Sequence, residues 1–174
     1  HNSHRQRLQD AALGQALAAV EEDGLADRPG IVVWGQDWHP GVVGLVAGRL
    51  REAFWRPAVA LAVEGEVARG SARGVPGLDL VDVLGECGEL LDRFGGHASA
   101  AGISLPARHL LEFRRRFEEA VASRIPAELL VPEVLVEAQV GLEEVTDRLL
   151  EELALLEPFG AGNPKPVLAV RDLQ

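Results

Sequence analysis

The 174-residue sequence contains no methionine or tyrosine, one cysteine and one lysine. Because Cys87 is alone, a disulfide framework or a cysteine-based metal cluster within the chain is excluded, and we expect a buried, unreactive thiol. No stretch approaches the roughly 20 apolar residues of a membrane span, and no basic segment leads into an apolar one at the start. The sequence therefore predicts a soluble, cytoplasmic protein without a membrane partner. Since it begins with His1 and lacks an initiator methionine, we expect a piece of a longer protein.

Positive charge is also scarce, since the formal net charge is −10. A nucleic-acid partner usually meets a basic surface, so this total at first argues against one. The acidity is concentrated at the end, however, because residues 125–174 hold 10 acidic and 3 basic side chains. An anionic ligand is therefore not excluded for the preceding part. Nearly all basic residues are arginine, which suits bidentate phosphate recognition but is explained equally well by genome composition.

The composition is that of a globular domain, with 47% hydrophobic and 25% charged residues. Its hydrophobic periodicity alternates between helix and strand. We expect helices over 5–22, 40–55, 79–94, 106–123 and 143–156, and strands over 31–34, 57–63, 67–73, 101–105 and 133–140. Asp79 is expected to cap the third helix and Gly95-Gly96 to end it. The inward positions expected on the fourth helix are Leu110, Leu111, Phe113 and Phe117.

This alternation predicts an α/β domain with a mixed β-sheet flanked by helices. A tight turn at Glu64-Gly65-Glu66 joins two of the strands as a hairpin, which excludes an all-parallel sheet. Charge and pattern change near Pro126. We therefore divide the chain into a connecting helix at 1–28, a substrate-binding domain at 29–125, and a connector that begins a further domain at 126–174.

Two glycine-rich segments carry the strongest functional signal. Gly70-Ser71-Ala72-Arg73-Gly74 places a hydroxyl and a guanidinium two residues apart on a strand, so both project from one face. Gly95-Gly96-His97-Ala98-Ser99-Ala100-Ala101-Gly102 presents an imidazole beside backbone that a ligand can approach closely. Such donors bind phosphate groups. The predicted phosphate site consists of Ser71, Arg73, Gly95, Gly96 and His97. The alternatives are a surface serine, a salt-bridged arginine and a structural histidine.

A third segment, Trp38-His39-Pro40-Gly41-Val42-Val43-Gly44, lies where a strand passes into a helix. Ligands of α/β proteins gather at such junctions, because the free N–H groups of the helix favour anions. His39 is therefore a candidate catalytic residue, with a structural histidine as the alternative. Gly41, Gly44 and Gly48 share one helix face, and we interpret them as packing positions rather than as a nucleotide loop.

In order and spacing, these three segments resemble the motifs of the DHHA1 domain of DHH-superfamily phosphoesterases. The segment at 95–102 is similar across that superfamily, which includes oligoribonucleases and cyclic-dinucleotide phosphodiesterases. The segment at 38–44 and the run at 158–166 more narrowly resemble RecJ-type single-strand-specific 5′→3′ DNA exonucleases. The likeness covers nearly the whole chain, and residues 158–166 are similar to the entrance of an OB-fold domain. Gly74 departs from the family pattern, which commonly has serine there, and the expected consequence is one hydroxyl contact fewer.

The resemblance implies that the chain is the DHHA1 part of an exonuclease of DNA repair and recombination. In that family two Mn²⁺ or Mg²⁺ ions, held by Asp and His residues of a preceding DHH domain, activate water for attack on the phosphodiester. This sequence has no Asp-His-His triplet. The resemblance therefore implies no metal bound by this chain and no hydrolysis by it alone. The implied partners are the DHH domain of the same protein and single-stranded DNA with a 5′ phosphate, gripped by Ser71, Arg73 and His97.

Two alternatives are carried forward. One is the DHHA1 part of an oligoribonuclease or of a cyclic-dinucleotide phosphodiesterase, which the OB-like continuation disfavours. The other is a non-catalytic module that binds nucleic acid without a DHH partner.

Overall fold

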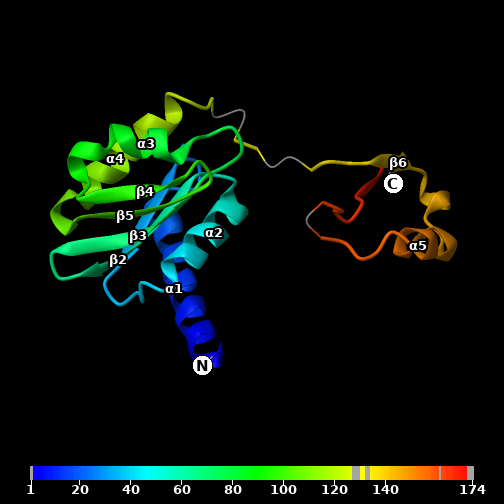
Figure 1. The fold of residues 1–174 in the computed structure, drawn as a ribbon, viewed down its shortest axis with the longest axis horizontal. Coiled ribbons are helices and arrows are strands. Elements are labelled where there is room, and N and C mark those ends of the chain that lie inside the picture. The colour runs from blue at the N-terminus through cyan, green and yellow to red at the C-terminus, as the bar shows by residue number, and fades with distance from the viewer. Residues whose placement is uncertain (1, 127–129, 132–133, 161, 172–174) are drawn as a thin grey trace. The chain divides into compact units, whose positions relative to one another are not determined.

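The computed structural model describes residues 2–126, 130–131, 134–160 and 162–171, and the chain forms two compact units, His1–Val131 and Pro132–Gln174. The first unit contains α1 (Asn2–Glu22), β1 (Ile31–Gly35), α2 (Val43–Phe54), β2 (Ala58–Glu64), β3 (Val67–Arg73), α3 (Leu80–Glu86), β4 (Arg93–His97), β5 (Ala100–Pro106) and α4 (Leu110–Ala122). Short 3₁₀ turns at Gly88–Leu90 and Ala107–His109 precede β4 and α4. Figure 1 shows the order of these elements along the chain.

A five-stranded sheet, in the order β1-β2-β3-β5-β4, forms the centre of the first unit. β1 pairs in parallel with β2, and the other neighbours are antiparallel. The expected mixed α/β sheet is thus confirmed. Gly65, with a φ of 59°, lies in the turn between β2 and β3, a left-handed conformation that glycine adopts without steric cost.

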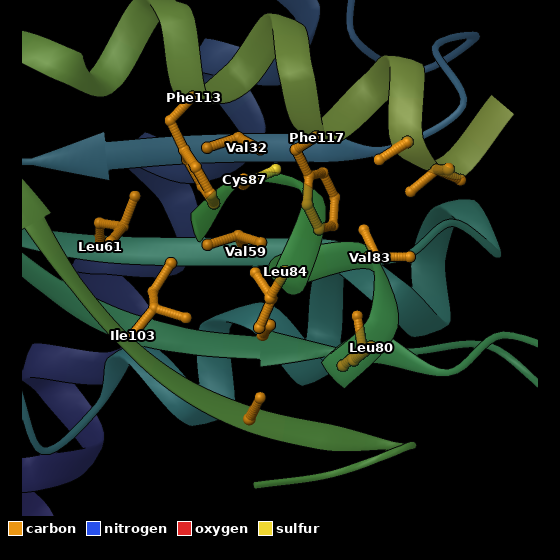
Figure 2. Close-up of a cluster of buried hydrophobic side chains, with 14 of the residues drawn as sticks. Val32, Val59, Leu61, Leu80, Val83, Leu84, Cys87, Ile103, Phe113 and Phe117 are labelled. Atoms are coloured by element: carbon orange, nitrogen blue, oxygen red, sulfur yellow. The ribbon is translucent and has the colours of Figure 1, made fainter. Parts of the chain in front are cut away.

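Helices cover the sheet from both sides (Figure 1). On one side, α3 and α4 share a buried cluster with Val59, Leu61 and Ile103 of the sheet, and Figure 2 shows Phe113 and Phe117 of α4 inside it. On the other side, α1 and α2 share a second cluster with the small residues of β2, which are Ala58, Ala60 and Ala62. Large and small side chains alternate along β2 because successive residues of a strand face opposite sides. The alanine side lets α2 approach the strands closely.

The segment after Asp79 differs from the helix expected over 79–94. Asp79 does cap the helix, since its carboxylate accepts a hydrogen bond from the Val81 N–H at 2.8 Å, but α3 ends at Glu86. Residues 93–97 form β4, which pairs along its whole length with β5. Gly95 and Gly96 therefore lie inside a strand and do not end a helix. Pairing with β5 overrides the apolar spacing that favoured a helix in this stretch.

Other expectations are corrected at the level of single residues and boundaries. α2 begins at Val43 rather than at residue 40. Leu110, Phe113 and Phe117 are buried as expected, whereas Leu111 is 71% exposed, because the buried stripe of α4 is narrow. Cys87 is buried in the cluster under α3 and α4, and this burial raises the pKa of its thiol to about 11.

The second unit contains β6 (Ala138–Val140), a 3₁₀ turn (Leu142–Glu144), α5 (Asp147–Ala154) and β7 (Leu168–Val170), with β6 and β7 paired in parallel. The strand expected over 133–140 is thus only three residues long in the described part, and residues 132–133 lie outside it. Thr146 caps α5 by accepting a hydrogen bond from the Leu149 N–H. No helix in the described ranges is long and apolar enough to cross a membrane.

Candidate functional site

On one side of the sheet, α2 packs against β2 and β3, and the α1 and α2 layer leaves β5 and β4 largely uncovered. In β3 and β5 the residues facing α3 and α4 are buried, and the alternate residues are half-buried or exposed. The edge strand β4 is exposed throughout. We call this side of β3, β5 and β4 the open face, which α2 borders at Ser71 and Arg73. It carries Arg69, Ser71 and Arg73 of β3, Ala100, Gly102 and Ser104 of β5, and Arg93, Gly95 and His97 of β4.

The strand register brings the predicted site residues into two adjacent rows on this face. Arg73 lies opposite Ala100, which lies opposite His97. Ser71 lies opposite Gly102, which lies opposite Gly95. Neighbouring strands are about 5 Å apart, so the backbones of Arg73 and His97 are separated by about 10 Å. The residues between them have small side chains or none, which leaves the face accessible to a ligand.

Arg73 is half-buried, and its guanidinium is mostly free of protein partners. Its Nη1 donates to the Ala72 carbonyl at 2.9 Å, and no carboxylate pairs with it among the described residues. None of the side-chain hydrogen bonds described for that part of the chain involves the Ser71 hydroxyl. Gly44 at the start of α2 lies directly against both, because a Cβ on Gly44 would be 3.0 Å from Nη2 of Arg73 and 3.4 Å from Oγ of Ser71. Gly41 precedes α2 and lies against the His39 ring, and a Cβ on Gly48 would meet nothing within 4 Å, so close helix packing explains Gly44 alone of the three.

The β4–β5 hairpin holds His97 at the end of its first strand, beside the turn formed by Ala98 and Ser99. Two hydrogen bonds tie this turn to the rest of the unit: Gly74 N–H donates to the Ser99 carbonyl at 2.9 Å, and Leu80 N–H donates to the Ala98 carbonyl at 3.0 Å. His97 is exposed and lies on the open face. The turn is therefore fixed in position while the imidazole stays accessible.

Close backbone approach around this hairpin requires glycine at residue 96 and leaves little room for a side chain at residue 74. A Cβ on Gly96 would lie 2.3 Å from the Ala100 carbonyl oxygen. A Cβ on Gly74 would lie 3.1 Å from the Ala98 carbonyl oxygen and 3.1 Å from Cγ of Leu80. A side chain at residue 74 would thus point toward the turn and away from the open face. The expected loss of a hydroxyl contact at Gly74 is not supported by this geometry.

His39 lies in the loop between β1 and α2, next to a buried anchor. Trp38 is 5% exposed, and its indole N–H donates to Gln15 of α1 at 2.7 Å. The His39 ring is exposed, and its Nδ1 accepts a hydrogen bond from the Gly41 N–H at 2.9 Å. In the neutral ring the proton then resides on Nε2, which faces solvent. Within the described residues, no hydrogen bond or ion pair joins His39 to Ser71, Arg73 or His97.

A hollow of about 520 Å³ continues the site past the end of β3. Arg51 of α2, Arg73, Ser99 and the loop at 74–78 line it. Sequence reasoning missed Arg51, because 22 positions of sequence separate it from Arg73 and only the packing of α2 on the sheet brings the two together. Among the described residues, no cluster of three or more His, Cys, Asp or Glu side chains could hold a metal ion.

Comparison with known proteins identifies the family. The family model of the DHHA1 domain matches residues 27–123. The chain belongs to the DHHA1 family. A second model, the RecJ OB domain, matches residues 136–174 and so follows the DHHA1 domain along the chain.

Relatives of this DHHA1 chain include the single-stranded-DNA-specific exonuclease RecJ of Bacillus subtilis, 38% identical over 98% of the chain and 22% of that protein. RecJ of Salmonella typhimurium is 32% identical over 95% of the chain and 30% of that protein. Among solved structures, RecJ from Thermus thermophilus in complex with Mg²⁺ superimposes with a TM-score of 0.80 and 34% identity, over 95% of the chain and 25% of that structure. The chain thus spans less than a third of the length of these relatives.

Proposed function

We propose that this DHHA1 chain is the DNA-holding part of a RecJ-type 5′→3′ single-strand-specific exonuclease of DNA repair and recombination, which works in the cytoplasm. Ser71, Arg73 and His97 hold a backbone phosphate of the strand, with the 5′-terminal phosphate as the preferred one. Gly95 and Gly96 give the strand room to approach. The Mn²⁺ or Mg²⁺ ions and the water that cuts the bond belong to a DHH domain of the same protein outside these residues, so this chain alone does not hydrolyse DNA.

The observation that carries this proposal is the guanidinium of Arg73, which lies on a sheet face beside the small residues Ala100 and Gly102. Arg69 of β3 and Arg114 and Arg115 of α4 each pair with a carboxylate, whereas no ion pair is described for Arg73. A planar guanidinium beside a hydroxyl can donate two or three charge-assisted hydrogen bonds to one phosphate. The RecJ OB segment at 136–174 and the RecJ relatives support a DNA exonuclease over an oligoribonuclease or a cyclic-dinucleotide phosphodiesterase.

The contribution of these residues to the reaction is positioning. A DNA strand that is fixed through its phosphates presents one scissile bond to the metal centre. Such alignment can lower the activation free energy of the reaction by several kcal/mol. The Nε2–H of His39 can donate a further hydrogen bond, because Nδ1 already accepts one from the Gly41 N–H. His39 also precedes α2, whose Gly44 lies against Arg73. We assign His39 to the wall of the same cleft.

The test is the binding of a fluorescein-labelled, 5′-phosphorylated single strand, followed by anisotropy at fixed salt. Arg73→Ala should weaken binding about tenfold, since it removes charge-assisted hydrogen bonds. Arg115→Ala on α4 is the matched control, because it removes the same charge from an exposed position already paired with Glu112 and Glu119. Equal losses in the two variants, or an equal loss of binding to duplex and single strand, would contradict the proposal.

A further inference from the structure

The hollow beside Arg73 has the chemistry of an anion site of its own, which we call the Arg51 pocket. Its wall combines two guanidinium groups, those of Arg51 and Arg73, with the Ser99 hydroxyl and the backbone of residues 74–78. No carboxylate belongs to its described lining. The chain as a whole has a net charge of −10, whereas the residues that line this hollow carry two positive charges and no negative one.

Arg51 is held at the end of α2 by weak contacts that a ligand could replace. Its guanidinium lies 6.0 Å from the centre of the Trp55 ring, and its Nη2 is 3.7 Å from Oε1 of Glu52. The Glu52 side chain is half exposed and also reaches Arg49 at 3.1 Å. An ion pair this exposed contributes little, so exchanging Glu52 for a phosphate costs Arg51 little.

The two carbonyl groups of the hairpin turn are already hydrogen-bonded within the protein. The carbonyl oxygens of Ala98 and Ser99 already accept hydrogen bonds from Leu80 and Gly74. Carbonyl oxygens directed into the pocket would repel an anion, and these two are occupied elsewhere. Ser99 also lines the pocket, and none of the hydrogen bonds described for this part of the chain involves its hydroxyl.

We propose that the Arg51 pocket binds a second phosphate of the bound strand, adjacent to the phosphate held by Ser71 and Arg73. Arg73 lies in both places, so its guanidinium is shared between two successive phosphodiesters. Arg51 and Ser99 supply the remaining donors. This inference rests on the proposed function, because it assumes that a nucleic-acid strand crosses the open face.

The experiment compares Arg51→Ala with Arg49→Ala in the 174-residue chain, using anisotropy of a 5′-phosphorylated oligothymidylate over a range of salt. Both arginines lie on α2, both reach Glu52, and only Arg51 lines the pocket. Arg51→Ala should weaken binding about fivefold and reduce the slope of log K against log salt by about 0.7, the change for one lost phosphate contact. Arg49→Ala should leave both quantities unchanged within twofold.

A set of oligonucleotides with one neutral methylphosphonate linkage at successive positions locates the contact. In the unmodified protein, one linkage near the 5′ end should cost about fivefold in affinity, and in Arg51→Ala that same linkage should cost clearly less, since only the contact with Arg73 remains. If Arg73→Ala weakens binding but Arg51→Ala behaves like Arg49→Ala, this inference fails and the proposed function stands. If Arg51→Ala lowers the affinity for all the modified oligonucleotides by the same factor, Arg51 acts through its general positive charge, and the pocket does not bind one particular phosphate. If Arg73→Ala also has no effect, both proposals fail.

Discussion

At the scale of single residues, Gly44 is a position where we expect a substitution to affect binding and leave stability nearly unchanged. Its missing Cβ lets Nη2 of Arg73 and Oγ of Ser71 approach the first turn of α2. A methyl group at that position would have to displace the end of a flexible side chain, which costs little in stability. The displaced group, however, is the one that we propose to hold the phosphate.

Gly44→Ala should therefore weaken binding to single-stranded DNA by about threefold or more, while the free energy of unfolding stays equal or rises by up to about 1 kcal/mol, because alanine favours helix. Gly48→Ala is the matched control, since a Cβ there meets nothing within 4 Å. It should stabilise α2 similarly and leave affinity unchanged. Urea unfolding and anisotropy measure the two quantities. A loss of affinity with Gly48→Ala of the same size would contradict this account of Gly44.

Cys87 is a second case in which one residue makes a measurable prediction. Burial raises the pKa of its thiol to about 11, so the folded state holds the proton more tightly than the unfolded state does. Between about pH 9 and pH 11 the unfolded chain therefore binds fewer protons, and this group's contribution to stability falls as pH rises. At pH 8 a thiol reagent such as DTNB should react with Cys87 far more slowly in the native protein than in urea. Rapid native labelling would mean that the thiol is accessible.

At the scale of elements, the β4–β5 hairpin decides the geometry of the open face. Two neighbouring glycines have different roles in it. A Cβ on Gly96 would meet the Ala100 carbonyl oxygen at 2.3 Å, whereas a Cβ on Gly95 would meet nothing within 4 Å. Gly96 is thus required by the fold, and Gly95 leaves room on the face that we propose to bind the DNA strand.

Gly96→Ala should destabilise the first unit by about 2 kcal/mol or more, because the clash is with backbone and the φ of 155° is one that residues with a Cβ rarely adopt. Gly95→Ala should change stability by less than about 1 kcal/mol and weaken DNA binding instead. Thermal unfolding and anisotropy on the two variants give the comparison. Equal destabilisation by both would contradict the division of roles.

Most elements could be predicted from periodicity, and the failures have a common physical cause. The hairpin at Gly65, the cap at Asp79 and the buried face of α4 follow from local chemistry. β4 does not, because its pairing partner is β5 and its glycines are equally typical of a helix end. The proximity of Arg51 to Arg73 could not be predicted from the sequence either, because it arises from the packing of α2 on β3. Local signals therefore predict most of the helices and strands, whereas β4 and the position of Arg51 beside Arg73 depend on contacts between distant segments.

At the scale of the whole molecule, the buried hydrophobic residues of the described chain all lie at or before Leu130. Both clusters therefore belong to the first unit. Arg56 also donates a hydrogen bond to the Leu130 carbonyl, which joins the end of that unit to the loop before β2.

A fragment of residues 1–131 should consequently fold alone, with a melting temperature within a few degrees of that of the main transition of the full chain. Calorimetry and near-ultraviolet circular dichroism test this. Loss of cooperative unfolding in the fragment would show that residues after 131 contribute to its core.

The two hydrogen bonds that tie Ala98 and Ser99 to Leu80 and Gly74 have a kinetic consequence. They order the hairpin tip during folding, so no loop has to be immobilised when a strand arrives. Association should then proceed in a single concentration-dependent phase, without a slower rearrangement behind it. Substitutions at the phosphate contacts should lengthen or shorten the lifetime of the complex much more than they alter the rate at which it forms.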